Sequence, residues 1–179
     1  LLLDRLGHAV VSAGRHQSHG ALLFIDLDNF KVLNDTLGHH TGDSLLQQVA
    51  TRLLDCVRAV DTVARLGGDE FVVLLEDLAT TGPEATELAE EVGKKILRSL
   101  NQHYELNGQI FHSSPSMGVA LFHDQLQNVD ELLQRADLAM YQAKSAGRNT
   151  MHFFEPDMQL ALRARAQMEV ELRHALQHR

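Results

Sequence analysis

The chain has 179 residues, 44% of them hydrophobic, which is enough for one globular domain with a full core and an appended helix. Its net charge of -8 argues against a broad surface for a nucleic acid polymer, because such surfaces rely on clustered Lys and Arg, but a single nucleotide could still bind together with a divalent cation. No uncharged apolar run reaches the roughly 18 residues of a membrane span, and the only cysteine, Cys56, cannot form an internal disulfide. We therefore expect a cytoplasmic fragment without membrane contact, whatever anchors its parent protein, and a reduced, buried Cys56.

Apolar residues recur at helical or strand spacing along most of the chain. The chain is expected to begin with a helix over 1–16 and a strand over 21–25 that ends at Asp26. A helix from about Thr41 through Cys56, with Thr41 or Gly42 as its cap, precedes two strands over 62–66 and 71–76 that form a hairpin, and a helix over 84–101 follows. The remaining elements are an Asn-Gly hairpin over 104–111, a strand over 117–122, a helix from a capping box at Asn128 and Glu131 to a glycine stop at Gly147, and a strand over 150–154. This order predicts an α+β fold with a mixed, mainly antiparallel central sheet flanked by helices.

The last stretch, residues 156–179, opens with Pro156 and then carries apolar residues at helical spacing. We expect it to form a helix that leads out of a domain made by residues 1–155. The start of this domain is expected to be truncated, because the chain begins inside a helical pattern.

The sharpest chemical feature is a pair of adjacent acids, Asp69 and Glu70, on a glycine turn between two apolar strands. Two acids on so tight a turn can point toward one cation, and Asp26 at the end of another strand can complete the set. Magnesium prefers one or two protein carboxylates together with phosphate oxygens of a substrate. Spacing alone fits equally well the polar residues of a solvated hairpin.

Three stretches carry a resemblance to a known family: GGDEF at 67–71, FIDLDNFKVLNDTLGHHTGD at 24–43 and ADLAMYQAKSAGRN at 136–149. On these residues the chain resembles the GGDEF domains, the diguanylate cyclase family. The resemblance implies a fold similar to the palm of polymerases and adenylate cyclases. It also implies the condensation of two GTP molecules into cyclic di-GMP with release of pyrophosphate.

The resemblance implies a metal site for Mg²⁺ or Mn²⁺. Asp26, the backbone carbonyl of Leu27, and Asp69 match the family's metal ligands, and Glu70 is implied as a further ligand or a catalytic carboxylate. Hard oxygen ligands suit these ions. Asp69 and Glu70 are thus the expected catalytic residues, and the sequence leaves open which acid takes the proton.

Asn34 and Asp43 match the family's guanine-reading pair. A carboxylate can accept from both N1-H and the 2-amino group of guanine, whereas adenine has no such donors, so the pair would select GTP over ATP. Taken without the family, Asn34 also fits a polar loop residue and Asp43 a favourable acid in the first turn of a helix.

Lys144 and Arg148 match the residues that hold the β- and γ-phosphates, with help from the backbone amides of Asn29, Phe30 and Lys31. Cations near the end of a helix also complement the helix dipole, and both roles can hold at once.

Arg58 and Asp61 form an Arg-x-x-Asp pattern that would arise by chance about once in a few chains. Five residues separate Asp61 from Gly67, the offset of the family's inhibitory product-binding motif. The resemblance therefore implies an allosteric site where cyclic di-GMP inhibits the enzyme, the Arg fork and the carboxylate gripping guanine bases.

The resemblance also bears on partners. A product of two GTP molecules requires a homodimer in which each domain holds one substrate. The stretch from Phe153 onward resembles the linker to a following EAL phosphodiesterase domain, so the parent is expected to hold both domains. The alternatives to an active cyclase are a catalytically silent GTP-binding module that controls the EAL domain, and a purely structural dimerisation domain.

Overall fold

The computed structural model describes residues 1–123, 128–158 and 168. The helices are α1 (Leu2–His16), α2 (Phe30–Leu37), α3 (His39–Cys56), α4 (Gly82–Leu100) and α5 (Val129–Ser145). The strands are β1 (His19–Leu27), β2 (Thr62–Gly67), β3 (Glu70–Ala79), β4 (Tyr104–Leu106), β5 (Gln109–Phe111), β6 (Pro115–Phe122) and β7 (Met151–Phe153). Most of the predicted C-terminal helix, 156–179, lies outside the described residues.

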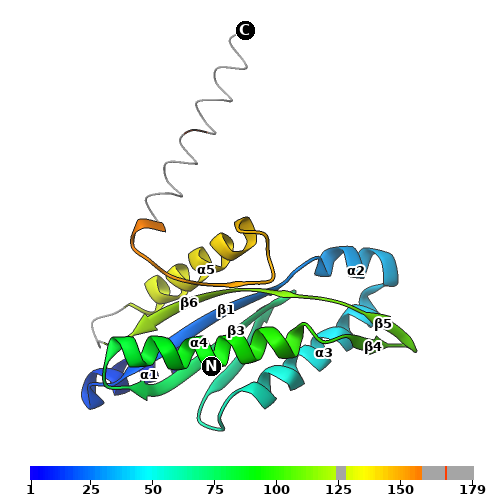
Figure 1. Cartoon of the computed structure of the whole chain (residues 1–179). Coiled ribbons are helices and arrows are strands. Elements are labelled where there is room, and N and C mark those ends of the chain that lie inside the picture. Colours follow the sequence, from blue (N-terminus) through cyan, green and yellow to red (C-terminus); the bar gives the residue numbers. More distant parts are fainter. Residues whose placement is uncertain (124–127, 159–167, 169–179) are drawn as a thin grey trace.

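The central sheet has five strands in the order β2-β3-β1-β6-β7. All neighbours in it are antiparallel except β6 and β7, which pair in parallel. The predicted Asn-Gly hairpin forms a separate pair, β4 and β5, and Figure 1 shows it with α2 at one end of the domain. The predicted mixed, mainly antiparallel α+β fold is confirmed.

Both faces of the sheet are covered by helices, and β1 is buried on both. Its side chains Ala21, Leu23, Ile25 and Leu27 join the core formed with α3 and α4, whereas Leu22 and Phe24 join the core formed with α1 and α5. Figure 1 shows α4 and α5 on different sides of the sheet. A strand buried on both faces needs apolar residues at every position, which explains the continuous apolar run in this part of the sequence.

The helix α2 was not predicted. Its eight residues follow β1 almost directly and are too few for a clear helical repeat. The prediction that Thr41 or Gly42 caps the next helix is wrong, because α3 begins at His39 and the Thr41 hydroxyl donates to the Leu37 carbonyl at 3.1 Å. Thr41 therefore helps to close the turn between α2 and α3.

Other local predictions hold. The Asn128 side chain accepts from the backbone N–H of Asp130 at 2.9 Å and caps α5 as predicted, but Glu131, the second member of the predicted capping box, pairs with Arg135 at 2.6 Å instead. Cys56 is buried with a free thiol. Within the described ranges, none of the helices has the length and apolar character needed to cross a bilayer.

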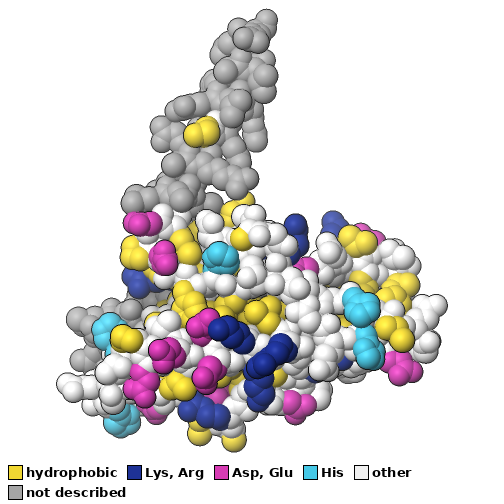
Figure 2. All heavy atoms as spheres, in the orientation of Figure 1, with side chains coloured by type: hydrophobic (Ala, Val, Ile, Leu, Met, Phe, Trp, Pro, Cys, Tyr) yellow, Lys and Arg dark blue, Asp and Glu magenta, His cyan; other side chains and the backbone are white. Residues whose placement is uncertain are grey.

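The surface seen in Figure 2 mixes acidic and basic side chains. It shows no broad area of basic side chains on this face, which agrees with the net charge of -8.

Candidate active site

Asp26 lies near the end of β1, where the strand leaves the core. In the sheet register it stands opposite Glu70 of β3 on one side and Ser116 of β6 on the other. Directly opposed residues of an antiparallel pair point to the same face, so the Asp26 and Glu70 carboxylates face the same space. Side chains of a strand alternate between its two faces, so Asp26 lies on the same face as Leu22 and Phe24, the face covered by α5. Asp26 is only 7% exposed.

Asp69 lies in the two-residue turn between β2 and β3, and Glu70 is the first residue of β3. The turn is possible because Gly68 adopts a positive φ of 51°. The backbone N–H of Leu27 donates to the Asp69 carbonyl at 3.3 Å, which ties the turn to the end of β1. The structure thus gathers the four predicted metal-site residues at one edge of the domain.

The site is crowded with negative charge. Burial raises the pKa of Asp26, and the nearby carboxylates Asp69 and Asp28 raise it further, while Lys144 acts in the opposite direction. Burial likewise raises the pKa of Glu70, with Asp26, Asp137 and Asp69 adding to the effect. Acids that repel one another in a partly desolvated site favour the binding of a cation.

The donor set fits Mg²⁺ or Mn²⁺, since all the candidate ligands are carboxylate or carbonyl oxygens. In the described part of the chain, no three Asp, Glu, His or Cys side chains are gathered closely enough to hold a metal by themselves.

Lys144 of α5 reaches the same carboxylates. Its Nζ lies 2.8 Å from Asp26 Oδ1, in a pair whose side chains are 31% and 10% exposed. The sequence predicted Lys144 as a phosphate ligand, and the structure places its ammonium beside the predicted metal ligand. A cation at this point already offsets part of the acidic charge.

Asp137 is a residue of this site that the sequence analysis did not single out. Lys144 lies seven positions, about two helical turns, after Asp137, so the two side chains share one face of α5. Burial raises the pKa of Asp137, with Lys144 opposing, and the Asp137 charge raises the pKa of Glu70. The seven-residue spacing was the signal that could have revealed it.

Asp137→Asn should stabilise the protein at neutral pH. A carboxyl whose folded pKa is raised favours folding only below its unfolded pKa of about 3.8, and its ionised form is unfavourable above the folded pKa. The variant should therefore melt slightly higher than wild type at pH 7, by less than about 2 °C, because Asp137 is an exposed residue and water screens its repulsion of Glu70. The difference should vanish near pH 3.5, and thermal denaturation at both pH values checks it; a lower melting temperature at pH 7 would contradict the acidic repulsion.

Helix α2 begins shortly after the end of β1 that carries Asp26 and Leu27. Asn29 precedes it in the left-handed region with φ of 60°, and its side chain makes no capping hydrogen bond. Phe30 is buried, which fixes the start of the helix, while Lys31 is exposed. The first amides of a helix lack intrahelical acceptors, so this turn offers N–H donors to an anion.

Arg148 is exposed just beyond α5. Its φ is 64°, and its backbone N–H donates to the Ala143 carbonyl at 3.1 Å. Asn149 also has a positive φ, 49°, and its N–H donates to Asp28 Oδ2 at 3.1 Å. These contacts hold the segment that bears Arg148 against the end of β1.

Asn34 and Asp43 lie on the neighbouring helices α2 and α3. The Asn34 Oδ1 atom is buried and has no hydrogen-bond partner among the described residues. It occupies the space that a Cβ at Gly42 would need, so a larger residue beside Asp43 would displace the Asn34 side chain. Asp43 is exposed and lines an open groove of about 430 Å³ between α3 and the β2–β3 hairpin. A buried unpaired oxygen next to an exposed carboxylate can receive hydrogen-bond donors of a base.

Arg58 and Asp61 lie far from these residues, on the approach to β2, and grip one another. The guanidinium donates to both Asp61 oxygens, at 3.0 and 2.7 Å, and to the Glu76 carbonyl at 2.6 Å. The Asp61 side chain is 1% exposed and that of Arg58 is 52% exposed. Arg58 is therefore the member of the pair that a ligand can reach, and Asp61 holds it in place.

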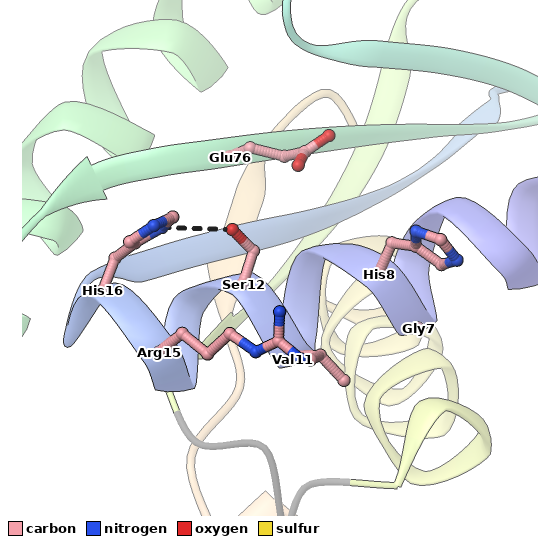
Figure 3. A pocket seen from close by; sticks show the side chains of 7 residues that line it. All are labelled: Gly7, His8, Val11, Ser12, Arg15, His16 and Glu76. Atoms are coloured by element: carbon pink, nitrogen blue, oxygen red, sulfur yellow. Dashed lines mark hydrogen bonds between the residues drawn. The ribbon is translucent and has the colours of Figure 1, made fainter.

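A cavity of about 750 Å³ adjoins Arg58 through Glu76. Figure 3 shows Glu76 of β3 across from α1, which contributes His8, Ser12, Arg15 and His16, with Ser12 hydrogen-bonded to His16 at 3.2 Å. Burial raises the pKa of Glu76, with Asp77 and Asp61 adding to the effect. Arg15 thus lines the same cavity as Glu76, whose backbone carbonyl accepts from Arg58.

The family described as "Diguanylate cyclase, GGDEF domain" matches residues 1–150. The bifunctional diguanylate cyclase/cyclic di-GMP phosphodiesterase MucR of Pseudomonas aeruginosa is 45% identical over all 179 residues, which make up 25% of MucR. The crystal structure of the GGDEF domain of TpbB (YfiN) from the same species has a TM-score of 0.80 and 37% identity, covering 90% of this chain and 92% of that one. The GGDEF domain of DgcB from Caulobacter crescentus, in complex with c-di-GMP, has a TM-score of 0.75 and 25% identity over 84% and 86% of the two chains.

Proposed function

Because the chain belongs to the GGDEF family of diguanylate cyclases, we propose that it condenses two GTP molecules into one cyclic di-GMP and releases two pyrophosphates. The observation that carries this proposal is the pairing of Asp26 with Glu70 across β1 and β3, with Lys144 at 2.8 Å from Asp26. A solvated hairpin would have no need for such an arrangement of acids and a cation. A purely structural domain would not need it either.

Asp26, Glu70, Asp69 and the Leu27 carbonyl would hold Mg²⁺ or Mn²⁺, which neutralises triphosphate charge and stabilises the α-phosphate during transfer. Burial and the Asp26 charge raise the pKa of Glu70. A bound divalent cation would act in the opposite direction, so the proton of the attacking 3′-hydroxyl is assigned to the turn pair Asp69 and Glu70 and not to one acid of it.

The substrate's phosphates would lie between two segments that meet at the end of β1. The amides of Asn29, Phe30 and Lys31 offer N–H donors from one side, and Arg148 offers a guanidinium from the other. Asp26 would bind the metal in place of Lys144, and the Lys144 ammonium would then contact the β- and γ-phosphates. The chain's net charge of -8 makes these local cations and the metal necessary for a polyanionic substrate.

Asp43→Asn should weaken GTP binding and lower the preference for GTP over ATP. The carboxylate would accept two guanine hydrogen bonds, and the amide has only one acceptor oxygen. Loss of one charge-assisted bond costs about 1.5–3 kcal/mol, so the affinity should fall at least about tenfold. Calorimetry with 3′-deoxy-GTP and Mg²⁺ measures it, with Asp35→Asn on α2 as an exposed acidic control. Equal affinities in wild type and Asp43→Asn would move guanine recognition elsewhere.

Turnover requires two copies of the domain, because each binds one GTP and the product has two-fold symmetry. The product would in turn bind at Arg58, beside the cavity that Arg15 and Glu76 line, and restrain the two domains from facing each other. GTP as substrate and a reduced Cys56 suit a cytoplasmic location.

A second candidate is a GTP-binding module that regulates a neighbouring phosphodiesterase domain without turnover. It is favoured by the similarity to MucR, whose name includes a cyclic di-GMP phosphodiesterase activity and of which this chain spans 25%. We propose that the parent of this chain also holds an EAL domain. Binding of 3′-deoxy-GTP without conversion of GTP would support the regulator, whereas conversion of GTP but not ATP supports the cyclase. Failure to bind both GTP and 3′-deoxy-GTP would contradict the cyclase and the regulator alike.

A further inference from the structure

Asp28 is a buried carboxylate that the proposed chemistry does not use. It follows β1 directly, between the Leu27 carbonyl and Asn29, and is 6% exposed. Its Oδ1 accepts from the Ser116 hydroxyl at 2.7 Å, and its Oδ2 accepts from the Ser114 hydroxyl at 2.6 Å. Oδ2 also accepts from the Asn149 backbone N–H at 3.1 Å. A buried acid with three donors is fixed in one position.

The partners of Asp28 come from distant parts of the chain. Ser116 lies at the start of β6, Ser114 immediately precedes this strand, and Asn149 follows Arg148 in the turn after α5. The backbone N–H of Asp28 also donates to the Ser114 carbonyl at 2.7 Å. One residue therefore joins the start of α2 to the segment that carries Arg148.

The segment after α5 needs such support. Arg148 and Asn149 are consecutive non-glycine residues with positive φ, 64° and 49°, a conformation that side chains disfavour. The Asn149 side chain accepts from Asn101 Nδ2 at 2.7 Å, and its backbone N–H is held by Asp28. Without the Asp28 bond, this turn would lose one of the contacts that keep Arg148 in place.

We propose that Asp28 is a positioning residue that sets the amides of residues 29–31 and the Arg148 guanidinium at a fixed separation for a nucleoside triphosphate. The role rests on the proposed function, because it needs both segments to hold phosphate. It predicts that Asp28 affects recognition of the β- and γ-phosphates and leaves recognition of the guanine base unchanged.

The test compares two ligands by calorimetry on the full chain with Mg²⁺. One is 3′-deoxy-GTP, which lacks the attacking hydroxyl, and the other is GMP, which lacks the β- and γ-phosphates. Asp28→Ala should weaken 3′-deoxy-GTP binding about tenfold and change GMP binding by less than about twofold. Asp28→Asn should stay close to wild type, because its amide oxygen can replace Oδ2 and its NH₂ can donate to the Ser116 hydroxyl.

Ser116→Ala is a milder variant that can be used if Asp28→Ala does not fold. It should also weaken the binding of 3′-deoxy-GTP more than the binding of GMP. Its matched control is Ser18→Ala, which removes a Ser–Asp hydrogen bond of the same 2.7 Å length, to Asp77, far from the phosphate segments. Ser18→Ala should leave the affinity for both ligands unchanged.

The positioning role would be overturned if Asp28→Ala or Ser116→Ala weakened the binding of both ligands equally. It would also be overturned if neither variant weakened the binding of 3′-deoxy-GTP. Arg148→Ala separates this failure from failure of the proposed function. Weaker 3′-deoxy-GTP binding in Arg148→Ala alone would reject only the role of Asp28. Unchanged binding in Arg148→Ala, or no binding by wild type, would reject the phosphate site and the role of Asp28 with it.

Discussion

Glu70→Gln should reduce the formation of cyclic di-GMP about 1,000-fold or more, and Asp69→Asn should do the same. Each change keeps the shape of the side chain and removes a charge from the site where Asp26 and Glu70 face each other. The fold should survive, since burial and the Asp26 charge raise the pKa of Glu70 and its ionised form is unfavourable to folding. The Glu70→Gln protein should therefore melt no lower than wild type at pH 7. Initial rates by nucleotide chromatography and circular dichroism measure the two effects.

The control for Glu70→Gln is Glu105→Gln, an exposed glutamate on β4. It makes the same chemical change outside the site and should leave the rate within about twofold, as expected for a surface substitution. Turnover that stayed near wild type in both Glu70→Gln and Asp69→Asn, with its dependence on a divalent cation intact, would reject these acids as the metal and catalytic residues.

Arg58→Ala should shift product inhibition to about thirtyfold higher cyclic di-GMP concentration while leaving initial rates near normal. The guanidinium is half exposed beside the cavity lined by Arg15 and Glu76, and one lost charged contact of about 2 kcal/mol gives this factor. The Asp61 carboxylate keeps the backbone donors of Arg58 and Glu76, at 2.9 and 3.3 Å, so the local fold should persist. Inhibition curves measured at fixed GTP give the shift.

Arg98→Ala is the matched control, because it removes an exposed arginine from α4. Its inhibition curve should overlay that of wild type. If Arg58→Ala also overlaid wild type, the Arg58–Asp61 pair would be a structural clamp on the Glu76 backbone, and the product would have to inhibit from another site.

Much of the fold could be predicted because its signals are local. The apolar run of β1, the acids on the turn before β3 and the Asn128 cap of α5 each depend on a few neighbouring residues, and each lies where the sequence places it. The short helix α2 could not be predicted, since eight residues give too little periodicity and its start depends on the left-handed Asn29.

The candidate site was predicted in its residues and less well in its contacts. The family resemblance identified Lys144 and Asp61 as site residues, but not their contacts. Lys144 reaches Asp26 only because α5 packs on the sheet, and Asp61 is buried beneath Arg58 only because of the turn before β2. The role of Asp28 depends on Asn149, more than 60 residues away along the chain, so no local pattern marks it. Asp137 acts on Glu70, also more than 60 residues away, and only its seven-residue spacing from Lys144 points to it.

We propose that this chain makes cyclic di-GMP from GTP, and the direct measurement is to incubate the purified chain with GTP and Mg²⁺ and to resolve the nucleotides by chromatography, with a parallel assay of pyrophosphate. We expect that two GTP molecules are consumed and two pyrophosphates released for each cyclic di-GMP formed, that ATP gives no product, and that Glu70→Gln is inactive. GTP that remains intact at protein concentrations high enough for two domains to meet would rule out the cyclase, and retained 3′-deoxy-GTP binding would then assign the chain to the GTP-binding regulators.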